Sequence, residues 1–303
     1  MTALAHFPHF APVVIGHKQP IQAITQGFLS YSDFNFVSLF SWNTTETPIE
    51  VSMLNNNLVV RFSDYTSDAA ILSFLGREAL VETIETLLAF SDAPHALGFI
   101  GQDIIDNLSE SARERYAIHD DRNNHDYILS VKKTIDYLNS GRKKANYNRF
   151  VCEYGPDIYC RSLNLGSSSD IQAIDSLTRM WQQQRGKNDE NVASELAALR
   201  RCLKYARKLV VQGYGVFVKD ELAAFGLFEI VNNDTAMLHF GKANLAFKGI
   251  TSYFQLKRAL YLASLGIRLM NWEQDLGIEG LRKYKESYHP IDFLKKYTMT
   301  KKT

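Results

Sequence analysis

Three runs of β-forming residues in the last third of the chain constrain its fold most strongly. They span residues 214–220, 221–232 and 235–244, and each is rich in aliphatic and aromatic side chains. Lys219–Asp220 and Asn232–Asn233–Asp234 lie at the ends of the first two runs, and such polar residues favour tight turns. The pattern predicts an antiparallel meander of three strands.

Helical patterns surround this meander. Apolar residues at helical spacing predict helices over 171–184 and 192–211, with a polar break at 185–191 between them. A third helix is predicted over 252–266, where Gly266 suits the residue that follows a helix end. A strand over 267–273 and a short helix over 280–288 follow. Two helices, a meander, a helix and a strand form the order expected of a GNAT-like unit.

The N-terminal half has a compatible order. Runs at 49–54 and 57–64 flank Asn55–Asn56, which predicts a β-hairpin. A strand over 69–76 and a helix over 77–90 follow, whereas 35–43 is predicted as a strand or a short buried element. We therefore predict an α/β (α+β) protein of two tandem GNAT-like domains, with mixed, mostly antiparallel sheets flanked by helices. The small polar run 166–170 marks the boundary, giving domains 1–165 and 166–303, the second carrying the active site.

Composition limits the partners and the compartment. The 34 Lys and Arg nearly balance the 33 Asp and Glu, so the net charge of the protein does not attract a polyanion. A polyanionic partner would have to bind a local cluster of basic residues. The three cysteines form no Cys-x-x-Cys pair, which favours free thiols in a reducing compartment. The N-terminus lacks a signal-peptide pattern, and no apolar run reaches the roughly 18 residues of a transmembrane segment. A cytoplasmic location is expected.

The stretch 271–290, NWEQDLGIEGLRKYKESYHP, resembles the closing motif of the phosphatidylglycerol lysyltransferase C-terminal family, a DUF2156-like family. The matching positions are Asn271, Glu273, Asp275, Leu276, Gly277, Gly280, Leu281, Arg282, Lys285, Ser287, Tyr288 and Pro290. Trp272 and Gln274 depart from the charged residues that are usual there. Further similar segments lie at 32–42, 126–130, 143–150, 238–244 and 247–249.

This resemblance implies a tandem GNAT-like fold in a bacterial protein. It also implies transfer of an aminoacyl group from aminoacyl-tRNA to an acceptor such as phosphatidylglycerol, without a further cofactor. No segment like the multispan membrane half of the lipid-modifying relatives is expected within this sequence, so an amine or a peptide is expected as an acceptor at least as much as a lipid. The alternatives are an acyl-CoA-dependent N-acyltransferase and a non-catalytic binding protein on the same fold.

Three residues are the candidate catalytic groups. Glu273 and Asp275 lie two apart, hence on one face if the strand continues, and they can hold the aminoacyl ammonium or act as a base. The alternative is that both are ordinary carboxylates at a strand end or helix cap. Tyr288 can donate a hydrogen bond to a reacting oxygen, although a tyrosine before His-Pro is more often a packing residue.

The predicted substrate-binding residues are Lys242, Lys248, Gly249, Asn271, Arg282 and Lys285. Arg282 and Lys285 are three apart on a helix, so both can face a phosphate, a carboxylate or Asp275; a structural ion pair is equally compatible. Lys248–Gly249 precedes a helix whose N–H groups can bind phosphate, or it is a plain turn. This segment has fewer glycines than a GNAT coenzyme loop, which counts against acetyl-CoA.

Basic residues gather in two helical segments. The predicted tRNA-binding residues are Arg142, Lys143, Lys144, Arg149, Arg200, Arg201, Lys204, Arg207 and Lys208. Together they form a candidate footprint for a tRNA acceptor end, although a solvated basic face also explains such a pattern. No metal site is predicted, because the histidines at 119 and 125 match no zinc-ligand spacing.

Overall fold

The computed structural model describes the chain except for residues 1, 46, 64–69, 91–94, 186–189 and 303. It divides into two compact units. The first unit comprises residues 1–126, 274–282 and 293–303, and the second comprises 127–273 and 283–292. The units are discontinuous in sequence, and they therefore differ from the predicted division at residue 165.

The first unit contains a seven-stranded sheet. Its order is β1 (Ala11–Pro12), β2 (Glu50–Leu54), β3 (Asn57–Ser63), β4 (Ala70–Leu75), β5 (Ala96–Gly101), β14 (Lys296–Lys301) and β6 (Tyr116–Asp120). Its helices are α1 (Lys18–Thr25), α2 (Phe36–Trp42), α3 (Leu80–Leu88), α4 (Gln102–Asn107) and α5 (Glu110–Arg113). The predicted hairpin is confirmed, because β2 and β3 are antiparallel and both turn asparagines have positive φ, 49° and 60°.

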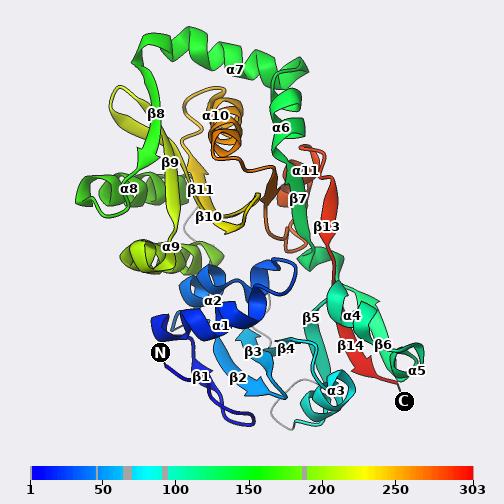
Figure 1. Ribbon diagram of the computed structural model, residues 1–303. Coiled ribbons are helices and arrows are strands. Elements are labelled where there is room, and N and C mark those ends of the chain that lie inside the picture. The colour runs from blue at the N-terminus through cyan, green and yellow to red at the C-terminus, as the bar shows by residue number, and fades with distance from the viewer. Residues whose placement is uncertain (1, 46, 64–69, 91–94, 186–189, 303) are drawn as a thin grey trace. The chain divides into compact units, whose positions relative to one another are not determined.

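The second unit contains another seven-stranded sheet (Figure 1). Its order is β13 (Asp292–Leu294), β7 (Asp126–Ser130), β12 (Leu269–Asn271), β11 (Thr235–Ala243), β10 (Glu221–Asn232), β9 (Gln212–Val218) and β8 (Ile158–Leu163). The helices are α6 (Val131–Leu138), α7 (Gly141–Tyr154), α8 (Ser168–Arg185), α9 (Glu190–Leu209) and α10 (Ile250–Ser264). Helix α11 (Glu279–Glu286) is shared, because its residues up to Arg282 belong to the first unit and those from Lys283 belong to the second. The predicted meander β9–β10–β11 is confirmed, while the predicted break at 185–191 lies mostly outside the described residues. No helix in the described ranges is long and apolar enough to cross a membrane.

Helices cover both faces of the second sheet. The side chains of 222–229 in β10 are all buried, as expected of a strand with neither face open to water. Helices α8 and α10 both pack against β10 and lie on its two sides in Figure 1. This layering confirms the predicted α/β class with mostly antiparallel sheets flanked by helices.

The two units repeat one arrangement. In each, an antiparallel meander leads through a helix to a strand parallel to its last member: β2–β3–β4, α3 and β5, then β9–β10–β11, α10 and β12. The next strand in each sheet comes from the other half of the sequence. Strand β14 pairs with β5, and β7 pairs with β12. The predicted domains 1–165 and 166–303 are each continuous in sequence, whereas each sheet includes a strand from the other half of the chain.

A buried charge network lies in the first unit. Lys296 pairs with Asp33 and places its Nζ 2.8 Å from Oδ1 of Asp126. Ser32 donates to the Asp126 carboxylate from its backbone N–H and its hydroxyl, over 2.7 and 2.6 Å. Gln274 donates to Asp33 over 3.2 Å. Lys296 and both aspartates are at most 1% exposed, so each charge depends on its partners for stabilisation.

Candidate functional site

A β-bulge in β11 changes the direction in which the side chain of His239 points. Leu227 of β10 pairs with Phe240, whereas Phe228 pairs with Leu238, so His239 is the extra residue between them. Parallel pairing of β11 with β12 ends at Met237 and Asn271. His239 and Glu273 therefore lie two residues beyond the last paired positions of the two strands.

His239 lies between two carboxylates. Its Nδ1 is 3.0 Å from Oε1 of Glu273, and its Nε2 is 3.1 Å from Oε1 of Glu229. The imidazole is 2% exposed, and the Glu229 and Glu273 side chains are 8% and 21% exposed. Burial alone lowers the pKa of His239, but the hydrogen bonds and charges of the two glutamates outweigh it and raise the pKa to about 9. Glu273 is thus the member of this Glu229–His239–Glu273 cluster that solvent reaches most.

Three hydrogen bonds hold the backbone of Glu273 in place. Its N–H donates to the side-chain oxygen of Asn271 over 2.7 Å, in the manner of an Asx turn. Its carbonyl oxygen accepts from the Tyr127 N–H over 3.1 Å and from Nζ of Lys285 over 3.2 Å. Asn271 is 0% exposed and Lys285 is 7% exposed. The structure thus brings the predicted residues Glu273, Asn271 and Lys285 together.

Asp275 has different partners from Glu273. Strand β12 ends at Asn271, and Glu273 has a φ of 56°, so the alternation expected of a continuing strand does not apply. The Asp275 carboxylate is 0% exposed and accepts from Arg282, over 2.8 and 3.0 Å, and from Arg122 over 3.0 Å. These three residues belong to the first unit. The expectation that Glu273 and Asp275 share a strand face is therefore wrong, and Arg282 serves as the ion-pair partner of Asp275.

Tyr288 lies in an aromatic cluster. Its ring centroid is 4.8 Å from that of Trp272 and 5.2 Å from that of Tyr284. The side chain is 1% exposed, and burial raises the pKa of its phenol far above the ordinary value. Lys143 of α7 places its Nζ 4.4 Å from the ring centroid, a cation–π contact. The catalytic role of Tyr288 stays a prediction.

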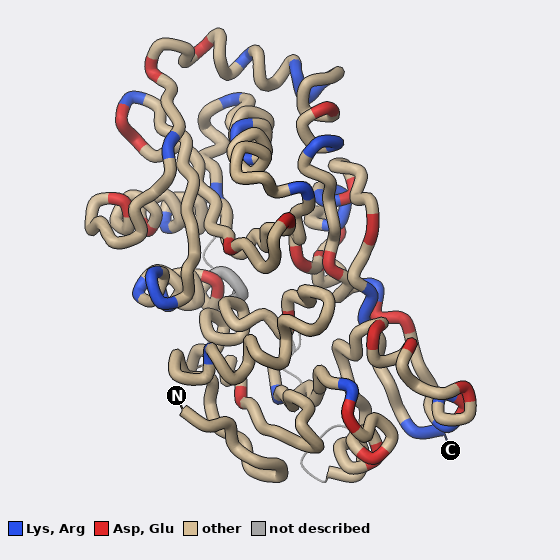
Figure 2. The backbone as a smooth tube through the Cα atoms, in the orientation of Figure 1, with Lys and Arg blue, Asp and Glu red and all other residues tan. Residues whose placement is uncertain are grey.

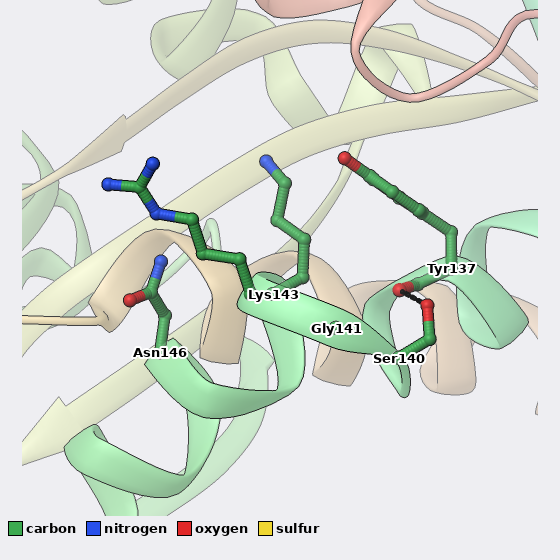
Figure 3. Close-up of a pocket in the computed structure, with 6 residues that line it drawn as sticks. Tyr137, Ser140, Gly141, Lys143 and Asn146 are labelled. Atoms are coloured by element: carbon green, nitrogen blue, oxygen red, sulfur yellow. Dashed lines mark hydrogen bonds between the residues drawn. The ribbon is translucent and has the colours of Figure 1, made fainter.

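A pocket of about 380 Å³ opens at the junction of α6 and α7. It is lined by Tyr137, Ser140, Gly141, Arg142, Lys143 and Asn146. Figure 3 shows Lys143 and Tyr137 projecting toward the same side of this junction. In the described part of the chain, neither Arg142 nor Lys143 forms an ion pair with a carboxylate. Burial and the neighbouring Arg142 lower the pKa of Lys143. The pocket thus presents cations that an anionic ligand can neutralise.

The other predicted cations have mixed surroundings. Lys242 pairs with Glu195 over 2.6 Å and lies 3.9 Å from the ring centroid of Trp181. Lys248 is exposed. Gly249 has a φ of 89°, and a Cβ there would lie 2.2 Å from the backbone oxygen of Asn146. Glycine is therefore required at this helix start by packing against α7.

Basic residues also lie on α7 and α9 (Figure 2). Lys144 lies 4.6 Å from the Tyr147 ring centroid, and Arg149 is exposed. On α9, Arg200 pairs with Asp175 over 2.7 Å, which neutralises part of the predicted stripe. The remaining residues of that stripe on α9 are Arg201, Lys204, Arg207 and Lys208. Their role in tRNA binding stays a prediction.

The pH dependence of stability tests the His239 contacts. The pKa of His239 is about 9 in the folded state, against an ordinary value of 6.5. The stabilisation that the two glutamates give to the protonated ring is therefore fully present below pH 6.5 and is lost as the pH rises to 9. We expect the free energy of unfolding to fall by about 3 kcal/mol over this range, the order that this change in pKa implies. Chemical unfolding at several pH values measures it. His239→Gln should flatten the dependence, and an unchanged pH dependence in that variant would contradict the assignment.

Sequence reasoning missed Glu229 and His239. His239 falls in the segment 238–244 that carries part of the family resemblance, but the bulge that turns it toward Glu229 leaves no mark in the residue pattern. Among the described residues, no group of three or more His, Cys, Asp or Glu side chains is arranged to hold a metal ion.

The family model described as phosphatidylglycerol lysyltransferase, C-terminal, matches residues 29–300. None of the curated proteins compared with the chain matches it. The match to the family therefore covers almost the whole chain and not only the closing motif 271–290.

Solved structures share the fold. A conserved protein of unknown function from Bacteroides thetaiotaomicron is 24% identical with a TM-score of 0.81, over 97% of this chain and 99% of that one. The C-terminal domain (DUF2156) of a putative lysylphosphatidylglycerol synthetase from Agrobacterium fabrum is 10% identical with a TM-score of 0.61, over 96% and 93%. L-PGS from Bacillus licheniformis is 13% identical with a TM-score of 0.60, over 100% and 95%. At these identities the likeness shows the fold alone.

Proposed function

The chain belongs to the phosphatidylglycerol lysyltransferase C-terminal family, and from that membership we propose that it transfers an aminoacyl group from aminoacyl-tRNA to a nucleophilic acceptor. The observation that carries this proposal is the Glu273 carboxylate, which is partly exposed and is held on His239 where β11 and β12 cease to pair. An aminoacyl ester is already activated, so its transfer chiefly requires alignment and removal of a proton from the acceptor.

Glu273 acts as the general base in this proposal. It takes the proton of the acceptor N–H or O–H while the acceptor atom bonds to the ester carbonyl carbon. The bond from that carbon to the ribose oxygen of tRNA then breaks. Glu273 returns the proton to the departing oxygen, so the carboxylate is regenerated and no covalent enzyme intermediate forms. The fixed backbone of Glu273, held by Asn271 and Lys285, supports such a positioned base.

The pocket at the α6–α7 junction supplies the tRNA contact. Arg142 and Lys143 line it without a carboxylate partner among the described residues, and phosphate oxygens are suitable ligands for both. The ring of Tyr288 contacts both Lys143, which lines this pocket, and Trp272, which precedes Glu273 in the sequence. The acceptor is an amine, a peptide or a lipid headgroup. Among the described residues no disulfide joins the cysteines, which favours the cytoplasm as the place of reaction.

The donor is tested with the purified protein. It is incubated with tRNA charged with labelled amino acids, in the presence of phosphatidylglycerol vesicles, a peptide or a simple amine, and the transfer of label to each acceptor is followed. Acyl-CoA donors form a parallel series, and heat-treated protein is the control. We expect discharge of tRNA with label on one acceptor. Consumption of an acyl-CoA with no binding or discharge of tRNA contradicts the proposal, and inactivity with both donors favours a binding protein.

Lys143→Gln tests the tRNA contact. Loss of one phosphate contact should weaken tRNA binding and reduce the slope of log affinity against log salt by about 1. Filter binding or fluorescence anisotropy at several salt concentrations measures both quantities.

Lys219→Gln is the matched control. Lys219 is a 74% exposed lysine that faces Asp157 across 3.8 Å, so its loss removes the same charge elsewhere in the second unit. Equal effects of the two substitutions on tRNA binding would show that only the net charge of the protein affects binding. The pocket would then have no role as a tRNA contact.

A further inference from the structure

Resting on the proposed function, we propose that Glu229 and His239 are positioning residues, which hold Glu273 as an oriented carboxylate with one oxygen engaged and the other left for the acceptor. His239 bonds to Oε1 of Glu273. Within the described residues no hydrogen bond to Oε2 is formed, and the side chain is 21% exposed. The carboxylate is thus engaged at one oxygen, and the side chain that carries it is partly open to solvent.

The geometry of His239 defines its protonation. Both ring nitrogens lie within 3.1 Å of a carboxylate oxygen, and a neutral imidazole has only one N–H to donate. An imidazolium donates to both glutamates at once. Two carboxylates and one imidazolium leave one net negative charge, and Glu273 is the member of the cluster that presents it to solvent.

Glu229 keeps the imidazole of His239 in one orientation. It lies on β10, is 6% exposed, and bonds to His239 from the side opposite Glu273. Leaving either buried group without its partner is costly, so the pair locks the ring in one orientation. Two carboxylates face His239, those of Glu229 from β10 and of Glu273 from the segment after β12. Lys285 of α11 approaches the same segment through the Glu273 carbonyl oxygen.

The imidazolium keeps its proton throughout the transfer. Glu273 takes the acceptor proton on its free oxygen and returns it to the departing ribose oxygen, while His239 continues to donate to Oε1. Above pH 9 the imidazolium loses its proton, and one of its two hydrogen bonds is lost with it. Activity should therefore decline on the alkaline side, because a neutral imidazole donates to only one of the two glutamates and no longer fixes its own orientation and that of Glu273 together.

His239→Gln and Glu229→Gln test this role. Each should lower kcat about 10-fold to 100-fold with little change in the KM for charged tRNA, since misplacing a reacting group by ~1 Å costs about 10²-fold. The alkaline decline should disappear in His239→Gln and move to lower pH in Glu229→Gln. Glu221→Gln, an exposed glutamate at the start of β10, is the matched control and should match the unchanged protein.

Histidine NMR of the unchanged protein supplies a readout that does not need activity. The chain has 8 histidines, and the signal missing in His239→Gln identifies this one. It should titrate near pH 9 and at lower pH in Glu229→Gln and Glu273→Gln. Titration near 6.5, or an unchanged kcat in both variants, overturns the positioning role. If the protein is inactive with every donor while His239 titrates near 9, the proposed function fails and the charged cluster stands.

Discussion

Lys296→Met is expected to destabilise the first unit by about 3–5 kcal/mol, the cost of removing one partner from a buried ion pair. The substitution preserves much of the side-chain volume but leaves Asp33 and Asp126 facing one another without their cation. Lys296 and Asp126 are 0% exposed and Asp33 is 1% exposed, so water cannot compensate. Native-state hydrogen exchange of the β14 amides measures the free energy of opening of this unit.

Lys301→Met is the matched control for this prediction. Lys301 lies on the same strand and pairs with Glu85 over 3.1 Å, but its side chain is 64% exposed. Its loss should cost at most about 1 kcal/mol, as is usual for surface ion pairs. Asp33→Asn gives a second comparison, because it leaves one carboxylate for one ammonium and should cost less than Lys296→Met. Equal effects of Lys296→Met and Lys301→Met would contradict the account of the buried network.

Local structure was predictable from the sequence because its signals are local. Asn55 and Asn56 predicted a turn, and both tolerate the positive φ that they adopt. The meander, the helix over α10 and its end at Gly266, with a φ of 80°, followed from residue patterns within a few turns of chain. Segment 35–43 was predicted only as a strand or a short buried element, and it forms the short buried helix α2. Almost all of α2 is buried, so it shows no helical stripe, and only the Asn35 cap, which accepts from the Ser38 N–H, marks its start.

The strand exchange was not predictable in this way. No property of 126–130 or 296–301 indicates that each completes a sheet whose other central strands are far away in sequence. The buried network gives a physical reason for one side of the exchange, since the charge of Lys296 at the start of β14 is stabilised by Asp126 at the start of β7 and by Asp33.

The site was predicted in part. Glu273, Asn271 and Lys285 were selected from the closing motif, and the structure brings them together. The link to Asp275 failed because the strand ends before Glu273 and the backbone turns there. Glu229 and His239 were missed because a contact between neighbouring strands depends on register, and the bulge in β11 changes that register by one residue.

Glu273→Gln is expected to lower kcat by about 10²-fold to 10⁴-fold, the range for loss of a general base. The amide keeps the shape of the side chain and an oxygen for His239, but it takes up no proton from the acceptor. The fold should survive, because His239 retains Glu229 at 3.1 Å and this leaves one imidazolium for one carboxylate. Steady-state transfer from charged tRNA measures the loss, with Glu221→Gln as the unaffected exposed glutamate.

The division of the effect between kcat and KM decides what Glu273 does. A general base acts only as the acceptor bonds to the carbonyl carbon, so its loss lowers kcat and leaves the KM for charged tRNA nearly unchanged. A carboxylate that held the ammonium of the aminoacyl group would bind the donor before the reaction, and its loss would raise KM instead. A raised KM with normal kcat would therefore reassign Glu273 to donor recognition. It would also remove the need for His239 to hold a free carboxylate oxygen toward the acceptor.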